Sequence, residues 1–325
     1  MDSDVPQIRP KWETQGRSTP EGHRPNLTEQ RNLIRQSVTN IISGIRTFSR
    51  FTLKIDDLLR FDIEITELDP LSPNDHTIFQ PLSLAEFHKY ELDEPLFGTL
   101  MLEGMKPKDL NISDLADRPI TRYEEEFAAM EEGERLLNYI ETLHTCYSKI
   151  EEPHEPFCMA SNWFQMQMPD RKYNVPREFG LNSWPHDQGL LAQNLGPEHV
   201  GWQYQAVSEF REDSLRGSKK WPHLRITVCH GHTGDPHGIL IGELGSIAQA
   251  ILNRLNEPAF DNESYFPVLV LSFFGPRYVR LLQAVHRPTG YLELRVSRIL
   301  DFTVMGMAPT DLILRYMTCF PHYDF

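Results

Sequence analysis

Three histidines, a cysteine and an aspartate lie close together in the stretch Cys229-His230-Gly-His232-Thr-Gly-Asp235-Pro-His237. Imidazole, thiolate and carboxylate groups are the ligands that zinc takes in proteins. Loops with His-x-His at a strand end occur in metallo-β-lactamase-type hydrolases, but their His-x-His-x-Asp-His spacing is not reproduced here. We therefore treat His230, His232 and His237 as candidate metal ligands and favour the alternative, a polar turn facing solvent, so that no metal ion is predicted.

A second chemically suggestive pattern is Glu293-Leu-Arg295, on the third of three successive predicted strands that follow a helix. PD-(D/E)xK nucleases have a comparable arrangement, in which two carboxylates hold a metal ion and a lysine assists. The preceding strand ends in His286-Arg287-Pro288 and offers no acid, and Arg295 stands where the lysine would be. We therefore interpret Glu293 and Arg295 as a surface cross-strand charge pattern.

Motifs for nucleophilic or phosphate chemistry are missing from the chain. It has no G-x-S-x-G, G-x-x-x-x-G-K-[ST] or G-x-G-x-x-G sequence. Gly242-Glu-Leu-Gly245 falls inside a predicted helix, and Ser272 falls in the middle of a predicted strand. The sequence therefore predicts no cofactor, and it leaves open whether the protein is an enzyme.

The elements that must position these residues lie between Trp221 and Phe302. Hydrophobic runs and alternation predict a strand, a helix and three more strands at Arg225–His230, Gly238–Leu255, Val268–Phe274, Arg277–Val285 and Tyr291–Ile299. Two strands joined by a helix predict a parallel crossover. Turns at Gly275-Pro276 and Pro288-Thr-Gly290 predict that the sheet continues with antiparallel strands. We expect an α+β fold with a C-terminal β-α-β-β-β core and a mixed sheet.

Two features of this core concern its charged residues. In the last strand, alternation places Leu292, Leu294 and Val296 on one face and Glu293 and Arg295 on the other. The helix is apolar around much of its circumference yet contains Glu243. A carboxylate in such a helix is expected at the edge of the buried face or in an ion pair.

Helical periodicity predicts two N-terminal helices that pack on the core. The first spans Asn26–Phe48, with Thr28 as a plausible N-cap, and the second spans Thr121–Ile150. The glutamates of the second helix, within 124–126 and 131–134, are expected to form a solvated face. Between the helices, Phe51–Leu68 fits either a helical turn or a strand.

The organisation along the chain follows from composition. We expect a disordered tail, a helix-rich acidic region, a loop-rich connecting segment pinned by its tryptophans and an α/β core, at residues 1–26, 27–160, 161–220 and 221–325. Residues 161–325 should form one folded unit with 27–160, and the long irregular segments should wrap around it.

The overall composition restricts the setting and the partners. Hydrophobic residues make up 40% and charged residues 24% of 325 residues, which is typical of a soluble globular protein. The formal net charge of -14 disfavours nucleic acid as a partner. No apolar run is long enough for a membrane span, and the N-terminus lacks the apolar region of a secretory signal. The four cysteines are scattered. We expect an intracellular protein, cytoplasmic or nuclear, with reduced thiols.

The core also resembles a known group of sequences. The residues concerned are Gly242-Glu-Leu-Gly-Ser-Ile-Ala, Pro267-Val-Leu-Val-Leu-Ser-Phe-Phe-Gly-Pro-Arg277 and Asp301-Phe302. This pattern is similar to a group of uncharacterised intracellular proteins from filamentous fungi, over about residues 222–302. The resemblance implies a fungal intracellular setting. The group has no known activity, so no functional residue is implied.

Two classes of function remain as expectations. The first is a non-enzymatic interaction or accessory protein, with another protein as a possible partner, because no catalytic motif accompanies the buried core. The alternative is a metal-dependent hydrolase or nuclease-like enzyme that uses the 229–237 histidine loop. The oligomeric state does not follow from the sequence.

Overall fold

The computed structural model describes residues 26–48, 50–72, 77–101, 122–151, 156–166, 190, 192–193, 201–212 and 219–322. Apart from Asn26, the predicted disordered tail lies outside the described residues. The α-helices are α1 (Leu27–Ile45), α2 (Ile55–Leu59), α3 (Leu84–Phe87), α4 (Glu94–Leu100), α6 (Arg122–Cys146), α7 (Ile241–Leu255) and α8 (Thr310–Met317). Short 3-10 helices are η2 (Phe157–Met159), η5 (Pro258–Phe260) and η6 (Met305–Met307).

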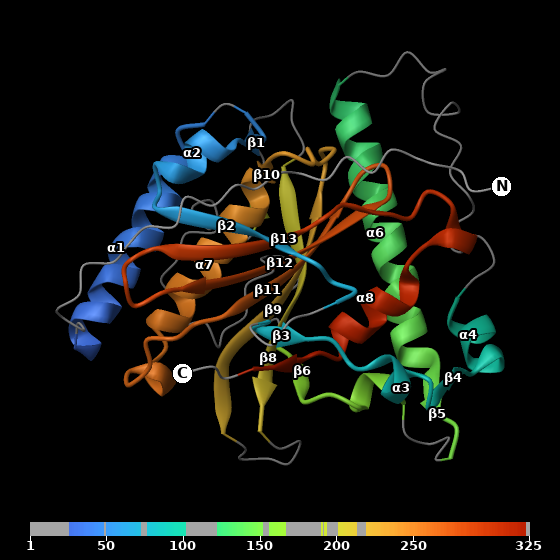
Figure 1. Ribbon diagram of the computed structural model, residues 1–325. Coiled ribbons are helices and arrows are strands. Elements are labelled where there is room, and N and C mark those ends of the chain that lie inside the picture. The colour runs from blue at the N-terminus through green and yellow to red at the C-terminus, as the bar shows by residue number, and fades with distance from the viewer. Residues whose placement is uncertain are drawn as a thin grey trace.

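Most of the long strands belong to one mixed sheet (Figure 1). Its central path runs β2-β13-β12-β11-β9-β8-β6, with β7 beside β8 and β14 beside β12. These strands span Ile63–Leu68 (β2), Trp163–Gln165 (β6), Ala192–Gln193 (β7), Trp202–Arg211 (β8), Lys220–His230 (β9), Val268–Phe274 (β11), Tyr278–His286 (β12), Leu292–Ser297 (β13) and Leu300–Asp301 (β14). Small two-stranded pairings involve β1 (Thr52–Leu53), β3 (Phe79–Gln80), β4 (Tyr90–Leu92), β5 (Tyr147–Lys149), β10 (Ile239–Leu240) and β15 (Phe320–Pro321).

The predicted α+β class and the β-α-β-β-β core are confirmed. Strands β9 and β11, on either side of α7, pair in parallel, as a crossover requires. Strands β11, β12 and β13 follow as antiparallel neighbours. The ambiguous stretch before them holds both alternatives, since α2 is a helical turn and β2 is a strand that pairs in parallel with β13.

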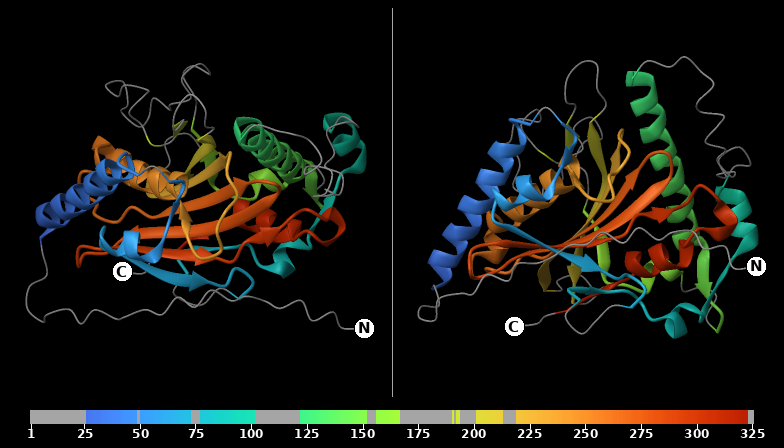
Figure 2. Two further views of the ribbon diagram at one scale, coloured as in Figure 1. Left: turned by 90° about the horizontal axis from the view of Figure 1, so that it is seen from above. Right: turned by 45° about the horizontal axis from the view of Figure 1, so that its top comes forward.

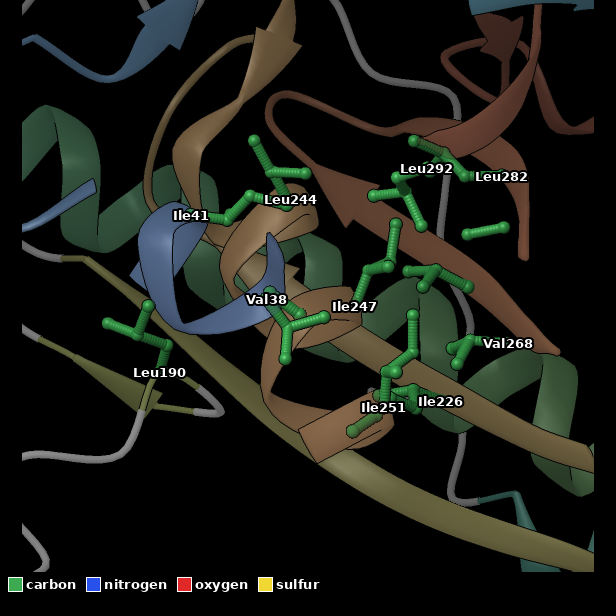
Figure 3. Close-up of a cluster of buried hydrophobic side chains, with 14 of the residues drawn as sticks. Val38, Ile41, Leu190, Ile226, Leu244, Ile247, Ile251, Val268, Leu282 and Leu292 are labelled. Atoms are coloured by element: carbon green, nitrogen blue, oxygen red, sulfur yellow. The ribbon is translucent and has the colours of Figure 1, made fainter. Parts of the chain in front are cut away.

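Helices cover both faces of the sheet (Figure 2), with α1 and α7 on one side and α6 and α8 on the other. The predicted apolar stripe of α1 is buried, and Val38 and Ile41 point toward Leu244 and Ile247 of α7 (Figure 3). Apolar side chains at alternate strand positions reach opposite layers, so Val268 and Val270 join the α1/α7 layer while Leu269 and Leu271 join the other. The prediction that N-terminal helices pack on the core is confirmed.

Two local predictions need correction. Helix α1 is capped by Asn26, whose Oδ1 accepts the Glu29 N–H at 3.1 Å while the Glu29 carboxylate accepts the Asn26 N–H at 2.9 Å. This reciprocal pair satisfies two backbone donors, so the helix begins before the expected cap Thr28. The glutamates of α6 are only partly solvated: Glu126 is buried, and Glu132 accepts a 2.8 Å hydrogen bond from Arg277 Nε.

The connecting segment 161–220 is less irregular than predicted, because β8 lies within it and pairs with β9. Two register shifts interrupt its alternation, and its buried positions include Ser208 and Glu209. Because both features interrupt the alternation of apolar and polar residues, the sequence pattern does not indicate a strand here. Tryptophans do anchor the segment, since Trp202 Nε1 donates to the Leu190 carbonyl at 2.8 Å and Trp163 Nε1 donates to the Cys319 carbonyl at 2.6 Å.

A buried ion pair connects α7 to the middle of the sheet. Glu243 and Arg280 are 0% and 1% exposed, and the guanidinium binds both carboxylate oxygens. The Glu243 carboxylate also accepts the Leu240 N–H at 2.8 Å. Arg280 Nη1 donates to the carbonyls of Asp235 and Gly238 at 3.1 and 2.8 Å. Glu243, which was expected in an ion pair or at the edge of the buried face, is therefore in an ion pair and fully buried.

We expect strong energetic coupling between these two side chains. Arg280→Met leaves the buried Glu243 carboxylate without its counter-charge, which lowers the unfolding free energy by about 3–5 kcal/mol. Glu243→Gln likewise leaves the Arg280 guanidinium without its counter-charge and should cost a similar amount. The double variant should lose less than the sum of the single variants, by roughly 0.5–3 kcal/mol. Urea unfolding of all four proteins measures this, with exposed Arg298→Met as the control. Additive losses would show that the pair does not act as a unit.

Candidate functional site

The histidine loop begins at the end of β9, where Cys229 and His230 point to opposite faces of the sheet. Cys229 lies in the hydrophobic layer beneath α6 and α8. His230 lies under the first turn of α7, where a Cβ added at Gly242 would come within 2.8 Å of the imidazole Cε1 and 2.4 Å of Trp202 Cγ. A side chain would not fit there, so glycine permits the close approach of helix and strand.

The three imidazoles occupy different environments. His230 is 2% exposed, and burial, with the nearby charges of Arg280 and His232, lowers its pKa to about 3. His232 packs on Phe51 with ring centroids 3.5 Å apart, and its Nδ1 lies 3.5 Å from Glu126 Oε1. The His237 side chain is exposed.

The loop does not assemble a recognisable metal centre. Across the part of the chain that the structure describes, no three His, Cys, Asp or Glu side chains are grouped so as to hold a metal ion. His230 Nε2 has no hydrogen-bond partner there and lies inside the protein, which suits a neutral imidazole. The alternative that His230, His232 and His237 together bind a metal ion gains no support from this geometry.

Replacing His230 by asparagine should weaken the acid sensitivity of folding. The pKa of His230 is about 3 in the folded protein, whereas an unfolded histidine titrates near 6.5. Between these values the unfolded chain binds a proton that the folded chain does not, so the unfolding free energy falls as the pH decreases. Without this imidazole, the slope should decrease by about 1 kcal/mol per pH unit.

Urea unfolding at several pH values from about 4 to about 7 measures that slope. His237→Asn is the matched control, because it removes an exposed histidine from the same loop and leaves the buried imidazole of His230 in place. An unchanged slope in His230→Asn would mean that His230 binds its proton equally in the folded and unfolded chains, so that its pKa is not lowered by burial.

A second candidate site lies on the other side of the sheet, around Glu293 of β13. Glu293 binds two arginines at once: Arg295 Nε donates to its Oε1 at 2.6 Å, and Arg287 Nε donates to its Oε2. The alternation predicted for this strand is confirmed, since Leu292, Leu294 and Val296 enter the α1/α7 layer. The structure departs from the predicted surface pattern, because Glu293 is only 8% exposed.

The two arginines determine the charge state of Glu293. Burial by itself would raise the pKa of this carboxyl, but the hydrogen bond from Arg287 and the charges of both arginines lower the pKa below its ordinary value. The same contacts raise the pKa of Arg287 against the effect of burial. The three side chains are therefore ionised at neutral pH and together carry one positive charge. We call Arg287, Glu293 and Arg295 the charged triad.

The triad lies in a cleft of about 520 Å³ on the face of the paired strands β13 and β2 that carries Glu293. Most of its lining residues are polar or charged in type: Glu64, Thr66, Glu67, Leu68, Asp69, Ser72, Thr77, Arg287, Tyr291, Glu293 and Arg295. Glu64 stands directly across from Glu293 in the parallel pairing. Like charges in this position repel each other, and the arginines that neutralise Glu293 allow the arrangement.

Tyr291 also lines the cleft, close to the carboxylates of Glu64 and Glu293. Burial and the charges of Glu64 and Glu293 raise the pKa of Tyr291, so the hydroxyl keeps its proton at neutral pH.

Sequence patterns identified only part of this cleft. Glu293 and Arg295 stood out through their alternation, whereas Glu64, Tyr291 and Arg287 were not singled out as site residues. The missing information is the pairing of β2 with β13, two strands from opposite ends of the chain. The sequence shows that β2 and β13 each carry charged residues on their polar faces. Nothing in the sequence indicates that these two strands are neighbours in the sheet.

Comparisons with the models of known protein families, with curated proteins and with solved structures found no match for this chain. Among the described residues, no helix combines the length and apolar character needed to cross a membrane. The arguments for a function therefore rest on the geometry of the cleft and of the histidine loop.

Proposed function

We propose that this protein is a non-enzymatic binding protein, and that the cleft over the paired strands β2 and β13 holds a small charged molecule. The observation that carries the proposal is the position of Arg287. This residue lines the cleft, and its Nε binds Glu293. Among the described residues, its two terminal nitrogens have no acceptor. They can donate to a carboxylate or phosphate oxygen of a ligand.

The size of the cleft supports a small molecule as the partner. Ligand sites typically measure about 300–1,000 Å³ and place a few polar groups so that they fix the orientation of the ligand. A cleft of about 520 Å³ falls within that range. Its lining is more polar than usual, with Leu68 as the one aliphatic side chain among the described lining residues. A polar, charged ligand is the chemical complement of such a lining.

The charge states of the triad favour binding over catalysis. General acid or base work needs a group whose pKa is near the working pH. The arginines lower the pKa of Glu293 instead, and burial with nearby carboxylates raises the pKa of Tyr291. Both groups therefore keep a single protonation state at neutral pH. Metal-dependent hydrolysis at the 229–237 loop and a protein partner stay predictions without such support.

Ligand-induced stabilisation of the folded protein tests this proposal. A panel of small carboxylates, amino acids and phosphorylated compounds is screened by thermal unfolding, and affinities are then measured by titration calorimetry. We expect at least one class to bind, with an unfolding free energy about 2.7 kcal/mol higher at a concentration of 100 times Kd. Arg287→Gln should abolish binding, because it removes the donor fork.

The control is Arg298→Gln, which removes an exposed arginine of the same chain segment outside the cleft. It should bind the ligand with unchanged affinity. The proposal fails if no member of the panel stabilises the protein, or if Arg287→Gln binds the ligand as tightly as the unmodified protein.

A further inference from the structure

Two of the four cysteines lie on chain segments that meet at the C-terminal end of α6, beside β4 and β5 (Figure 1). Cys146 is the last residue of α6, and Cys158 is the middle residue of η2. Between them, Ser148 pairs with Pro156 in an antiparallel bridge. Each cysteine is two residues outside this bridge, and such positions in antiparallel chains face each other again on one side. The bridge therefore directs the two cysteines toward each other.

Side-chain packing brings η2 onto the end of α6. Phe157, which precedes Cys158, is fully buried, and the centroid of its ring lies 5.4 Å from that of His144 and 6.3 Å from that of Tyr147. His144 and Tyr147 stand on either side of Cys146 in the chain. The negative charge of a Cys158 thiolate is one of the causes that raise the pKa of Cys146, as expected for neighbouring thiols.

We propose that Cys146 and Cys158 form a reversible oxidation site, in which a disulfide joins η2 to the end of α6. The inference concerns a different part of the molecule from the cleft and does not depend on the proposed binding function. The oxidant that the reaction requires is a small disulfide of the class of glutathione disulfide.

The accessibility of the two thiols determines the order of the steps. Cys158 is partly exposed, whereas Cys146 is buried. Cys158 loses its proton to water, and its thiolate attacks one sulfur of glutathione disulfide, which forms a mixed disulfide and releases one glutathione. Cys146 then loses its proton and attacks Cys158 Sγ, so that the second glutathione leaves. Two protein thiols are oxidised to one disulfide, and one glutathione disulfide is reduced to two thiols.

The other two cysteines are unsuited to this reaction. Cys229 and Cys319 are both 0% exposed. Burial raises the pKa of Cys229 well above its ordinary value and that of Cys319 to about 12. Because the thiolate is the nucleophile, both should remain thiols. Burial raises the pKa of Cys146 and Cys158 as well, so their oxidation should accelerate as the pH increases.

The disulfide would close a ring from residue 146 to residue 158 at the end of the helix that covers one face of the sheet. A cross-link of this kind restricts the unfolded chain more than the folded chain, whose ends are already adjacent. The Asp93 N–H, which donates to the Cys146 carbonyl at 2.9 Å, already fixes the backbone on the α6 side. The oxidised protein should therefore be the more stable form.

Oxidation of the full-length folded protein by glutathione disulfide at about pH 8 tests the proposal. Remaining thiols are blocked with N-ethylmaleimide, and the linked peptides are identified by mass spectrometry. We expect two of the four thiols to disappear and one peptide pair to contain Cys146 and Cys158. The midpoint of thermal unfolding should rise by roughly 5 °C, and dithiothreitol should restore the original value.

Single variants test the role of each thiol. Cys146→Ala should keep one glutathione on Cys158, because no second thiol displaces it, and Cys158→Ala should lose no thiol at all. Cys229→Ala is the matched control and should still form the disulfide. Thermal unfolding under reducing conditions verifies that each variant is folded. If Cys146→Ala does not fold, Cys158→Ala at the partly exposed position provides the test.

Three results would overturn the proposal. The first is the survival of all four thiols in the oxidised sample. The second is a disulfide that involves Cys229 or Cys319 in the folded protein. The third is glutathione that stays on Cys158 of the unmodified protein, which would show that Cys146 cannot reach Cys158 Sγ.

Discussion

The ion pair between Glu243 and Arg280 holds together the part of the molecule on which everything else is built. The Glu243 carboxylate accepts a backbone N–H at the start of α7. The Arg280 guanidinium donates to backbone carbonyls of the loop that precedes this helix. Arg280 itself belongs to β12, near the middle of the sheet. Both charges are buried, which is costly unless every donor and acceptor is satisfied. The contacts around them meet that requirement and join one helix, one loop and one strand.

The same principle recurs at the other end of α7. Arg254 is fully buried, and it binds Glu257 at 2.6 Å and Glu209 of β8 at 3.2 Å. One long apolar helix is thus attached at its first turn to β12 and at its last turn to β8. The hydrophobic layer supplies the area that is removed from water, and the two charged contacts specify the orientation of the helix over the strands.

The charged triad is built from the same residue types, but it is open on one side. Arg287 is 31% exposed at the side chain, in contrast to Arg254 and Arg280. A guanidinium that uses one nitrogen for its carboxylate and lines a cleft keeps donors for another molecule. This difference in closure, and not a difference in residue type, distinguishes the candidate binding site from the two structural ion pairs. The histidine loop differs again, because helix packing places His230 in the interior and leaves His237 at the surface.

The sequence by itself determined the elements of the core and the faces of its strands. Local periodicity is enough for α7, β11, β12 and β13, and for the opposition of Leu294 and Glu293, because these follow from the repeat of a single helix or strand. Strand β8 was missed since its bulges and buried polar residues break that repeat. Only the tertiary structure decided that β2 lies beside β13, so that Glu64 stands next to Glu293 and both line the same cleft. Strand pairing across such a distance depends on the packing of the whole sheet, and no short-range pattern encodes it.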